Sequence, residues 1–141
     1  MKKLFSAGYN ADAFNIALLI LRLGSGILMA SHGYDKLIQY NEMKVKFMSF
    51  IGLSPAITLG LVIFAELVCA ILVAIGLFTR LACIPLIILL CVALFQVHNA
   101  DFFGEGQVAV LYLVIYVTLL FTGPGKFSID HIITGKKHRN Y

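Results

Sequence analysis

The first apolar run of the chain, residues 16–37, contains ionisable side chains that a membrane-spanning helix does not ordinarily carry. Arg22 lies near the middle of the run, and His32 and Lys36 lie near its end. At about 100° per residue these three residues fall on one stripe of a helix, and the opposite face is almost wholly aliphatic. Because a charge that faces lipid costs roughly 3 kcal/mol, we expect the stripe to face protein or water.

Glu66 is the ionisable residue of the second long apolar run, residues 55–78. At a rise of about 1.5 Å per residue from the helix ends on one side, Arg22 lies roughly 13–14 Å deep and Glu66 roughly 18 Å deep. An arginine head can span the difference, so the sequence predicts an ion pair between Arg22 and Glu66. The pair would either frame a functional site or only lock two helices together, since buried pairs specify geometry more reliably than they add stability.

A second group of polar residues lies at the other ends of the predicted helices and in the loop between the third and fourth. If the helices pack in order, these groups converge on a pocket that opens toward the outer leaflet, and tyrosines of the fourth helix line the way inward. The alternative is an interfacial network that only caps helix ends. The candidate pocket residues are Arg22, His32, Lys36, Glu66, His98, Asp101, Glu105 and Tyr112.

The chemistry that these residue types favour is proton transfer to a bound quinone, which needs titratable groups beside an apolar slot. The spacing contains no His-x-x-x-His, no Glu-x-x-His and no cysteine cluster, so we expect no metal site. Haem ligation by His32 and His98 is disfavoured because both residues lie at helix ends. No residue is assigned as catalytic from the sequence.

Composition identifies the class of protein. Of the 141 residues, 60% are hydrophobic and 13% are charged, with a mean hydropathy of +0.93, whereas a soluble domain has about a quarter charged residues. We therefore expect an integral membrane protein. The formal net charge of +4 comes from basic residues near the chain ends, which predicts contact with anionic lipid rather than with nucleic acid.

The periodicity predicts an all-α protein, a four-transmembrane-helix bundle that forms one integral membrane domain over residues 1–141. The predicted helices are 13–37, 55–78, 81–98 and 105–122, with a short amphipathic interfacial helix at 42–51 and a basic C-terminal tail at 126–141. Ser54 is the expected N-cap of the second span, with Pro55 at its first position. The distribution of Lys and Arg places both termini in the cytoplasm.

Several short motifs, in this order and spacing over about residues 14–133, resemble the DoxX family of small four-helix membrane proteins. They are Arg22, residues 32–37, residues 52–55, Glu66, residues 76–80, His98, Glu105 and residues 123–130. The resemblance implies a multi-pass protein of a bacterial inner (plasma) membrane. It also implies a connection with oxidoreductase complexes, because relatives include a membrane subunit of a thiosulfate:quinone oxidoreductase.

Three functional hypotheses follow. The first is a subunit of a membrane oxidoreductase complex, with no intrinsic cofactor, that binds quinone or a small anionic ligand in a polar intramembrane pocket. Its partners would be the lipid bilayer, other protein subunits and further copies of the chain. The second is a non-enzymatic scaffold or assembly factor for a partner protein. A small transporter or lipid-binding protein is a third hypothesis, and four spans without discontinuous helices disfavour transport.

Overall fold

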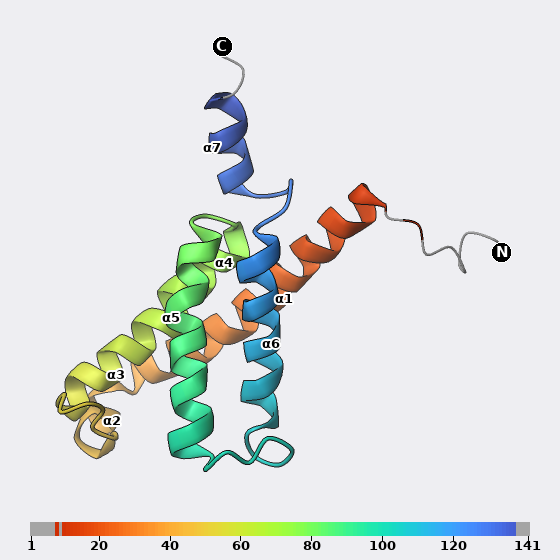
Figure 1. Ribbon diagram of the computed structural model, residues 1–141. Coiled ribbons are helices and arrows are strands. Elements are labelled where there is room, and N and C mark those ends of the chain that lie inside the picture. The colour runs from red at the N-terminus through yellow and green to blue at the C-terminus, as the bar shows by residue number, and fades with distance from the viewer. Residues whose placement is uncertain (1–7, 9, 138–141) are drawn as a thin grey trace.

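Helices make up all of the regular structure in residues 8 and 10–137, which are the residues that the computed structural model describes (Figure 1). The prediction of an all-helical protein is confirmed over that part of the chain. In chain order the elements are α1 (Ala11–Ile38), α2 (Tyr40–Lys46), α3 (Pro55–Ile63), η1 (Phe64–Cys69), α4 (Ala70–Ile75), α5 (Thr79–Val92), η2 (Ala93–Val97), α6 (Gln107–Thr122) and α7 (Ile129–Lys137). The segments η1 and η2 are π-helical turns that continue the α-helices around them.

Within the described residues, three helical runs are long and apolar enough to cross a membrane. They are α1 with 28 residues, the continuous run α3–η1–α4 with 21 and the run α5–η2 with 19. The next helix, α6, has 16 residues and begins at Gln107, later than the fourth span predicted from residue 105. The length and composition of these runs agree with the predicted membrane protein.

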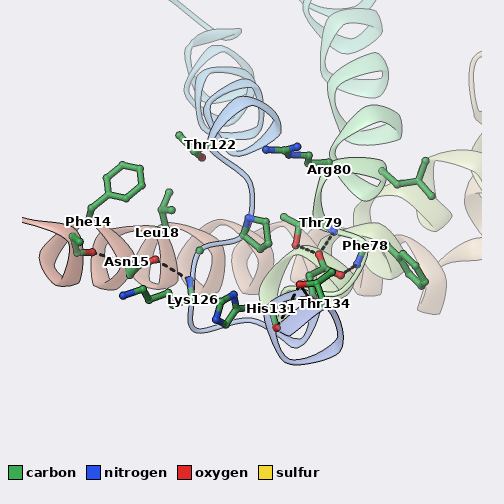
Figure 2. Close-up of a pocket in the computed structure, with 15 residues that line it drawn as sticks. Phe14, Asn15, Leu18, Phe78, Thr79, Arg80, Thr122, Lys126, His131 and Thr134 are labelled. Carbon is green, nitrogen blue, oxygen red and sulfur yellow. Dashed lines mark hydrogen bonds between the residues drawn. The ribbon is translucent and has the colours of Figure 1, made fainter. Parts of the chain in front are cut away.

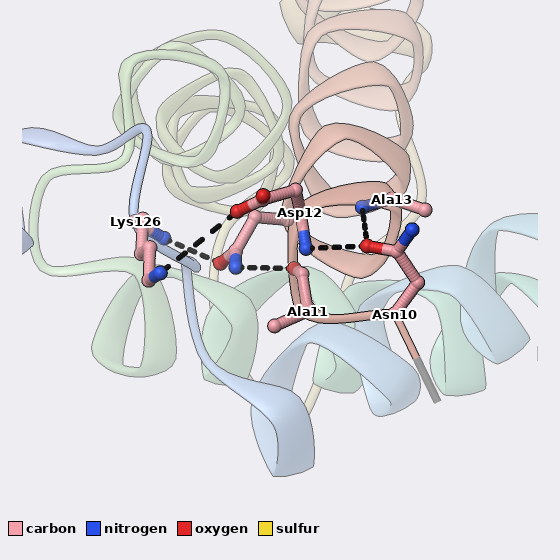
Figure 3. Close-up of polar contacts among 6 residues, drawn as sticks. Asn10, Ala11, Asp12, Ala13 and Lys126 are labelled. Carbon is pink, nitrogen blue, oxygen red and sulfur yellow. Dashed lines mark hydrogen bonds and ion pairs between the residues drawn. The ribbon is translucent and has the colours of Figure 1, made fainter. Parts of the chain in front are cut away.

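Local hydrogen bonds set where two of the long helices begin. Ser54 Oγ accepts a hydrogen bond from the third backbone N–H of α3 at 3.4 Å, and Pro55 occupies the first position, which confirms the predicted start. At the start of α1, Asn10 Oδ1 accepts from the N–H groups of Asp12 and Ala13 at 3.0 and 3.2 Å (Figure 3). Both caps satisfy donors that a helix leaves without an internal partner.

The segment between α1 and α3 differs from the predicted interfacial helix at 42–51. Helix α2 ends at Lys46 because Phe47 adopts an extended backbone, with φ −69° and ψ 155°. Residues 47–50 are not helical, and three of them line a cavity that is described below. The apolar spacing of this segment therefore reflects contact with the cavity rather than one continuous helical face.

Two glycines let α1 approach the α3–η1–α4 run closely. A Cβ at Gly26 would lie 2.7 Å from a carbonyl oxygen of α4, and a Cβ at Gly33 would lie 2.6 Å from the backbone nitrogen of Leu67 in η1. The two backbones are thus in direct contact at two levels, as small residues allow between membrane helices. On the other side, the fully buried Tyr116 of α6 donates its hydroxyl hydrogen to Ser25 O at 3.1 Å, which ties α6 to α1.

A helix lies within the predicted basic tail at 126–141. Residues 129–137 form α7, and residues 138–141, like 1–7 and 9, lie outside the described residues. Asp130 of α7 closes the turn between α4 and α5. Its carboxylate accepts hydrogen bonds from Phe78 N at 2.8 Å, Thr79 N at 3.0 Å and Thr79 Oγ1 at 3.1 Å, so it satisfies the first donors of α5.

The substitution Asp130→Ala is expected to lower the free energy of unfolding by about 2 kcal/mol, because it removes three hydrogen bonds to one charged acceptor at a helix start. Denaturation of the detergent-solubilised protein in mixed micelles measures this loss. Asp12→Ala is the matched control, since the Asp12 side chain is 85% exposed and lies 4.0 Å from Lys126 Nζ, a pair that adds little. Equal losses for the two variants would contradict the capping role of Asp130.

Candidate functional site

A cavity of about 620 Å³ lies between the α3–η1 run and the α5–η2 run. Its walls are mostly apolar, and the polar residues among its lining are Lys36, Thr58, Glu66 and His98. Lys36 comes from the last turn of α1, and residues 47, 48 and 50 complete the wall. Small-molecule sites are typically this large and have a mostly apolar lining with a few polar groups. We term this site the Lys36 cavity.

An ion pair joins two of the polar residues of the Lys36 cavity. Lys36 Nζ lies 2.6 Å from Glu66 Oε2, and the two side chains are 25% and 12% exposed. The predicted ion pair between Arg22 and Glu66 is therefore wrong, because the carboxylate of Glu66 binds Lys36 instead. The two partners satisfy each other within a largely apolar environment.

The register between α1 and the second run explains this difference. Gly33 lies against the backbone of Glu66, since a Cβ there would be 2.8 Å from Glu66 C. Three residues further along α1, Lys36 can therefore reach the Glu66 carboxylate. The first turns of α1 extend beyond the turn between α4 and α5 (Figure 1). Arg22 therefore lies level with this α4–α5 turn and not with Glu66. The predicted depths of Arg22 and Glu66 were counted from the ends of their two helices, on the assumption that these ends lie at the same level, which they do not.

Arg22 is only 1% exposed and lies at the opposite end of the bundle from the Lys36 cavity. Its Nη2 donates a hydrogen bond to Phe127 O at 2.5 Å, and its Nε and Nη1 have no hydrogen-bond partner among the described residues. Asp130 is the anionic group that interacts with it electrostatically. Arg22 thus joins α1 to the segment that follows α6 and to the turn between α4 and α5.

His98 brings a ring nitrogen without a hydrogen-bond partner to the Lys36 cavity. The residue follows η2 as its C-cap and lines the cavity in a half-buried position. Its Nδ1 is buried and has no hydrogen-bond partner in the described part of the chain. A buried polar atom without a partner is costly unless water or a ligand binds it. His98 therefore has a ring nitrogen that is available for hydrogen bonding.

Both π-helical turns of the described chain border the Lys36 cavity. Three residues of η1, including Glu66, and two residues of η2 line it, and His98 follows directly after η2. Single π-helical turns within α-helices are frequent at functional sites, because the extra residue changes which side chains face inward. Neither turn contains glycine or proline, so the sequence carries no local signal for this distortion.

The remaining predicted pocket residues do not line the Lys36 cavity. His32, Asp101 and Glu105 are exposed, and the Asp101 carboxylate orders its own loop by accepting two backbone N–H groups at 2.9 and 3.2 Å. Tyr112 is half-buried and stacks on Tyr116 with ring centroids 6.2 Å apart. The structure thus brings three of the predicted residues to one cavity and leaves the others outside it.

The cavity also includes residues that were not predicted to line the pocket, namely Thr58 and the apolar side chains of residues 47, 48 and 50. The Thr58 hydroxyl donates to Ser54 O at 3.1 Å and is thereby satisfied. The sequence signal that could have identified residues 47, 48 and 50 is the periodic apolar pattern of residues 43–51. This pattern fits a cavity wall as well as it fits an amphipathic helix. Among the described residues, no group of three or more His, Cys, Asp or Glu side chains could hold a metal ion.

Comparison with known proteins identifies the family. The family model DoxX matches residues 17–99, which include the whole α3–η1–α4 run and most of α1. The chain is 32% identical over 130 residues to the protein named "Putative oxidoreductase CatD" of Bacillus subtilis (strain 168), across 91% of this chain and 96% of that protein. No solved structure matches the chain. The protein therefore belongs to the DoxX family.

Proposed function

We propose that this protein is a subunit of a membrane oxidoreductase complex and binds a quinone, or a small anionic ligand, in the Lys36 cavity. The observation that carries the proposal is the placement of Lys36, Glu66 and His98 on one mostly apolar cavity of about 620 Å³. The name of the Bacillus subtilis relative supports the reaction class. The buried, unpartnered Nδ1 of His98 supports a bound polar group at this position.

The proposal includes four membrane spans, with α6 as the fourth, in a bacterial plasma membrane. Tyr116 ties α6 to α1, and α6 is apolar throughout most of its length, which supports a place within the bundle. Arg80 and Lys126 lie at the end of the bundle where α1 begins and α7 lies, and the sequence has further basic residues close to its two ends. By the positive-inside rule this end would be cytoplasmic, and the Lys36 cavity would open toward the outer leaflet.

A quinone has two carbonyl oxygens that accept hydrogen bonds and, on reduction by two electrons, takes up two protons. In this proposal the imidazole of His98 binds one carbonyl and exchanges a proton with it. The ammonium of Lys36 binds an oxygen with negative charge, and Glu66 holds Lys36 in place. A partner subunit with its own redox group would supply or accept the electrons.

Quinone retention tests the proposal. The full chain, purified in detergent, is expected to retain quinone that organic extraction and chromatography detect, and His98→Ala and Glu66→Gln are expected to retain about tenfold less. His32→Ala is the matched control, because His32 is exposed and outside the cavity. Folded wild-type protein that repeatedly carries no quinone, and shows no spectral change when quinone is added, would contradict the proposal.

A non-enzymatic scaffold is the second candidate function. The closed ion pair between Lys36 and Glu66 favours it, because two of the three ionisable groups already neutralise each other. A scaffold predicts that Glu66→Gln and His98→Ala lose a co-purifying partner protein, while the wild type shows neither quinone binding nor turnover. Retention of quinone by the wild type and its loss in the same variants would favour the oxidoreductase subunit instead.

A further inference from the structure

A second cavity, of about 730 Å³, lies at the opposite end of the bundle, where α1, α5, α6 and α7 meet (Figure 2). It shares no lining residue with the Lys36 cavity. Its lining comes from all four of these helices and from the segment between α6 and α7. We term it the Arg80 groove.

The Arg80 groove carries basic side chains that are not engaged in strong ion pairs. Arg80, Lys126 and His131 line it, and all three are exposed. Arg80 Nη2 makes one long hydrogen bond, 3.4 Å, to Phe121 O. Lys126 Nζ lies 4.0 Å from an Asp12 oxygen, and both side chains are mostly exposed (Figure 3). Both cations therefore retain donors for an anionic ligand.

The acidic residue of the groove does not cancel this charge. The Asp130 carboxylate accepts three hydrogen bonds from Phe78 and Thr79 at the start of α5. It also interacts with the buried guanidinium of Arg22. Because its oxygens are committed to these donors, the groove presents Arg80 and Lys126 as its unsatisfied charges.

Backbone contacts fix where these cations lie. Asn15 Oδ1 accepts a hydrogen bond from Lys126 N at 2.8 Å, and Asn15 Nδ2 donates to Ala11 O at 2.6 Å, which ties the Lys126 segment to α1 (Figure 2). The Arg80 guanidinium lies over Gly123, where a Cβ would be 3.3 Å from Nε. The cations thus belong to a built groove rather than to an extended tail.

Apolar side chains form part of the groove wall, and several of them are also exposed on the outer surface of the helices. Phe14 and Leu18 of α1 line one side, and Phe78 and Leu81 line the other. Phe14, Phe78 and Leu81 are exposed. A ligand that matches both features has an anionic phosphate and hydrocarbon chains, whereas free phosphate matches only the first.

We propose that the Arg80 groove binds an anionic glycerophospholipid. The anionic headgroup of the lipid binds Arg80 and Lys126, one acyl chain runs along Phe14, and the other runs along Leu81. A lipid in this position would bridge α1, α5 and the segment before α7. The proposal is independent of what the Lys36 cavity binds.

Lipid binding to the purified full chain tests the proposal. In native mass spectrometry from non-ionic detergent, the wild type is expected to retain phosphatidylglycerol about tenfold more strongly than phosphatidylcholine. The double variant Arg80→Gln/Lys126→Gln is expected to lose this preference. The matched control Lys44→Gln/Lys46→Gln, which removes two positive charges in the last turn of α2, is expected to keep this preference.

Three results would overturn the proposal. The first is equal retention of the two lipids by the wild type, and the second is an equal loss of phosphatidylglycerol in the two glutamine double variants. The third is displacement of phosphatidylglycerol by millimolar inorganic phosphate alone, which would indicate a free-phosphate site. The charge-conserving variant Arg80→Lys/Lys126→Arg is expected to retain phosphatidylglycerol within about threefold of the wild type. If Arg80→Gln/Lys126→Gln fails to fold, the charge-conserving variant and the comparison of the two lipids on the wild type still test whether the groove binds an anionic lipid.

Discussion

The substitution Gly76→Ala is expected to lower the free energy of unfolding by about 3 kcal/mol or more. Gly76 ends α4 in the left-handed conformation, with φ +74°, which strains any residue that has a Cβ. A Cβ there would also overlap Nη1 of Arg22 and lie 2.6 Å from Ser128 Cβ. Arg22 is enclosed and hydrogen-bonded to a backbone carbonyl, so its guanidinium has little room to move away.

The matched control is Gly52→Ala. Gly52 has nearly the same backbone angle, φ +76°, but no atom lies within 4 Å of a Cβ built there, so only the conformational strain of about 1 kcal/mol remains. Denaturation in mixed micelles measures both losses. Combining Gly76→Ala with Arg22→Ala is expected to cost less than the sum of the single losses, because the overlap is removed. Equal losses for Gly76→Ala and Gly52→Ala would show that Arg22 does not pack on this turn.

The substitution Gly33→Ala is expected to lower the free energy of unfolding by about 2–3 kcal/mol and to reduce quinone retention. A Cβ at this position would lie 2.6 Å from Leu67 N and 2.8 Å from Glu66 C. These are backbone atoms of η1, so the clash is relieved only when α1 moves away from η1. That movement separates Lys36 from Glu66, which are now 2.6 Å apart.

Two other glycines of α1 provide controls for this result. Gly24 has no atom within 4 Å of a built Cβ, so Gly24→Ala is expected to leave stability unchanged or raise it by about 0.5 kcal/mol. Gly26→Ala clashes with α4, since its Cβ would lie 2.8 Å from Ala74 Cβ, and is expected to destabilise the protein while affecting the more distant Lys36 cavity less. Identical quinone retention in Gly33→Ala and Gly24→Ala would contradict the role of Gly33 in placing Lys36.

The candidate site could be predicted from the sequence only in part. Lys36, Glu66 and His98 stand out as ionisable residues within or beside apolar runs, and all three line one cavity. The same reasoning selected Asp101 and Glu105, which are exposed in a loop that Asp101 itself orders. Position along each helix indicates which residues lie toward the same end of the bundle, but it does not fix their relative height or indicate which side chains face the same space.

The features that the sequence by itself determined are local. Apolar runs of sufficient length identify membrane-spanning helices, and Ser54 and Pro55 begin α3, because each signal depends on residues within a few positions of one another. The predicted helix 55–78 ends earlier than expected, at Ile75, because Gly76 adopts a left-handed backbone.

Only the tertiary structure decided which charge meets Glu66. The partner depends on the register and tilt of α1, which close contacts at Gly26 and Gly33 set, and on how far α1 extends beyond the α4–α5 turn. These contacts place Lys36 at Glu66 and Arg22 at Gly76, at opposite ends of the bundle. Long-range contacts of this kind leave no local signal, since they depend on the shapes of two helix surfaces at once.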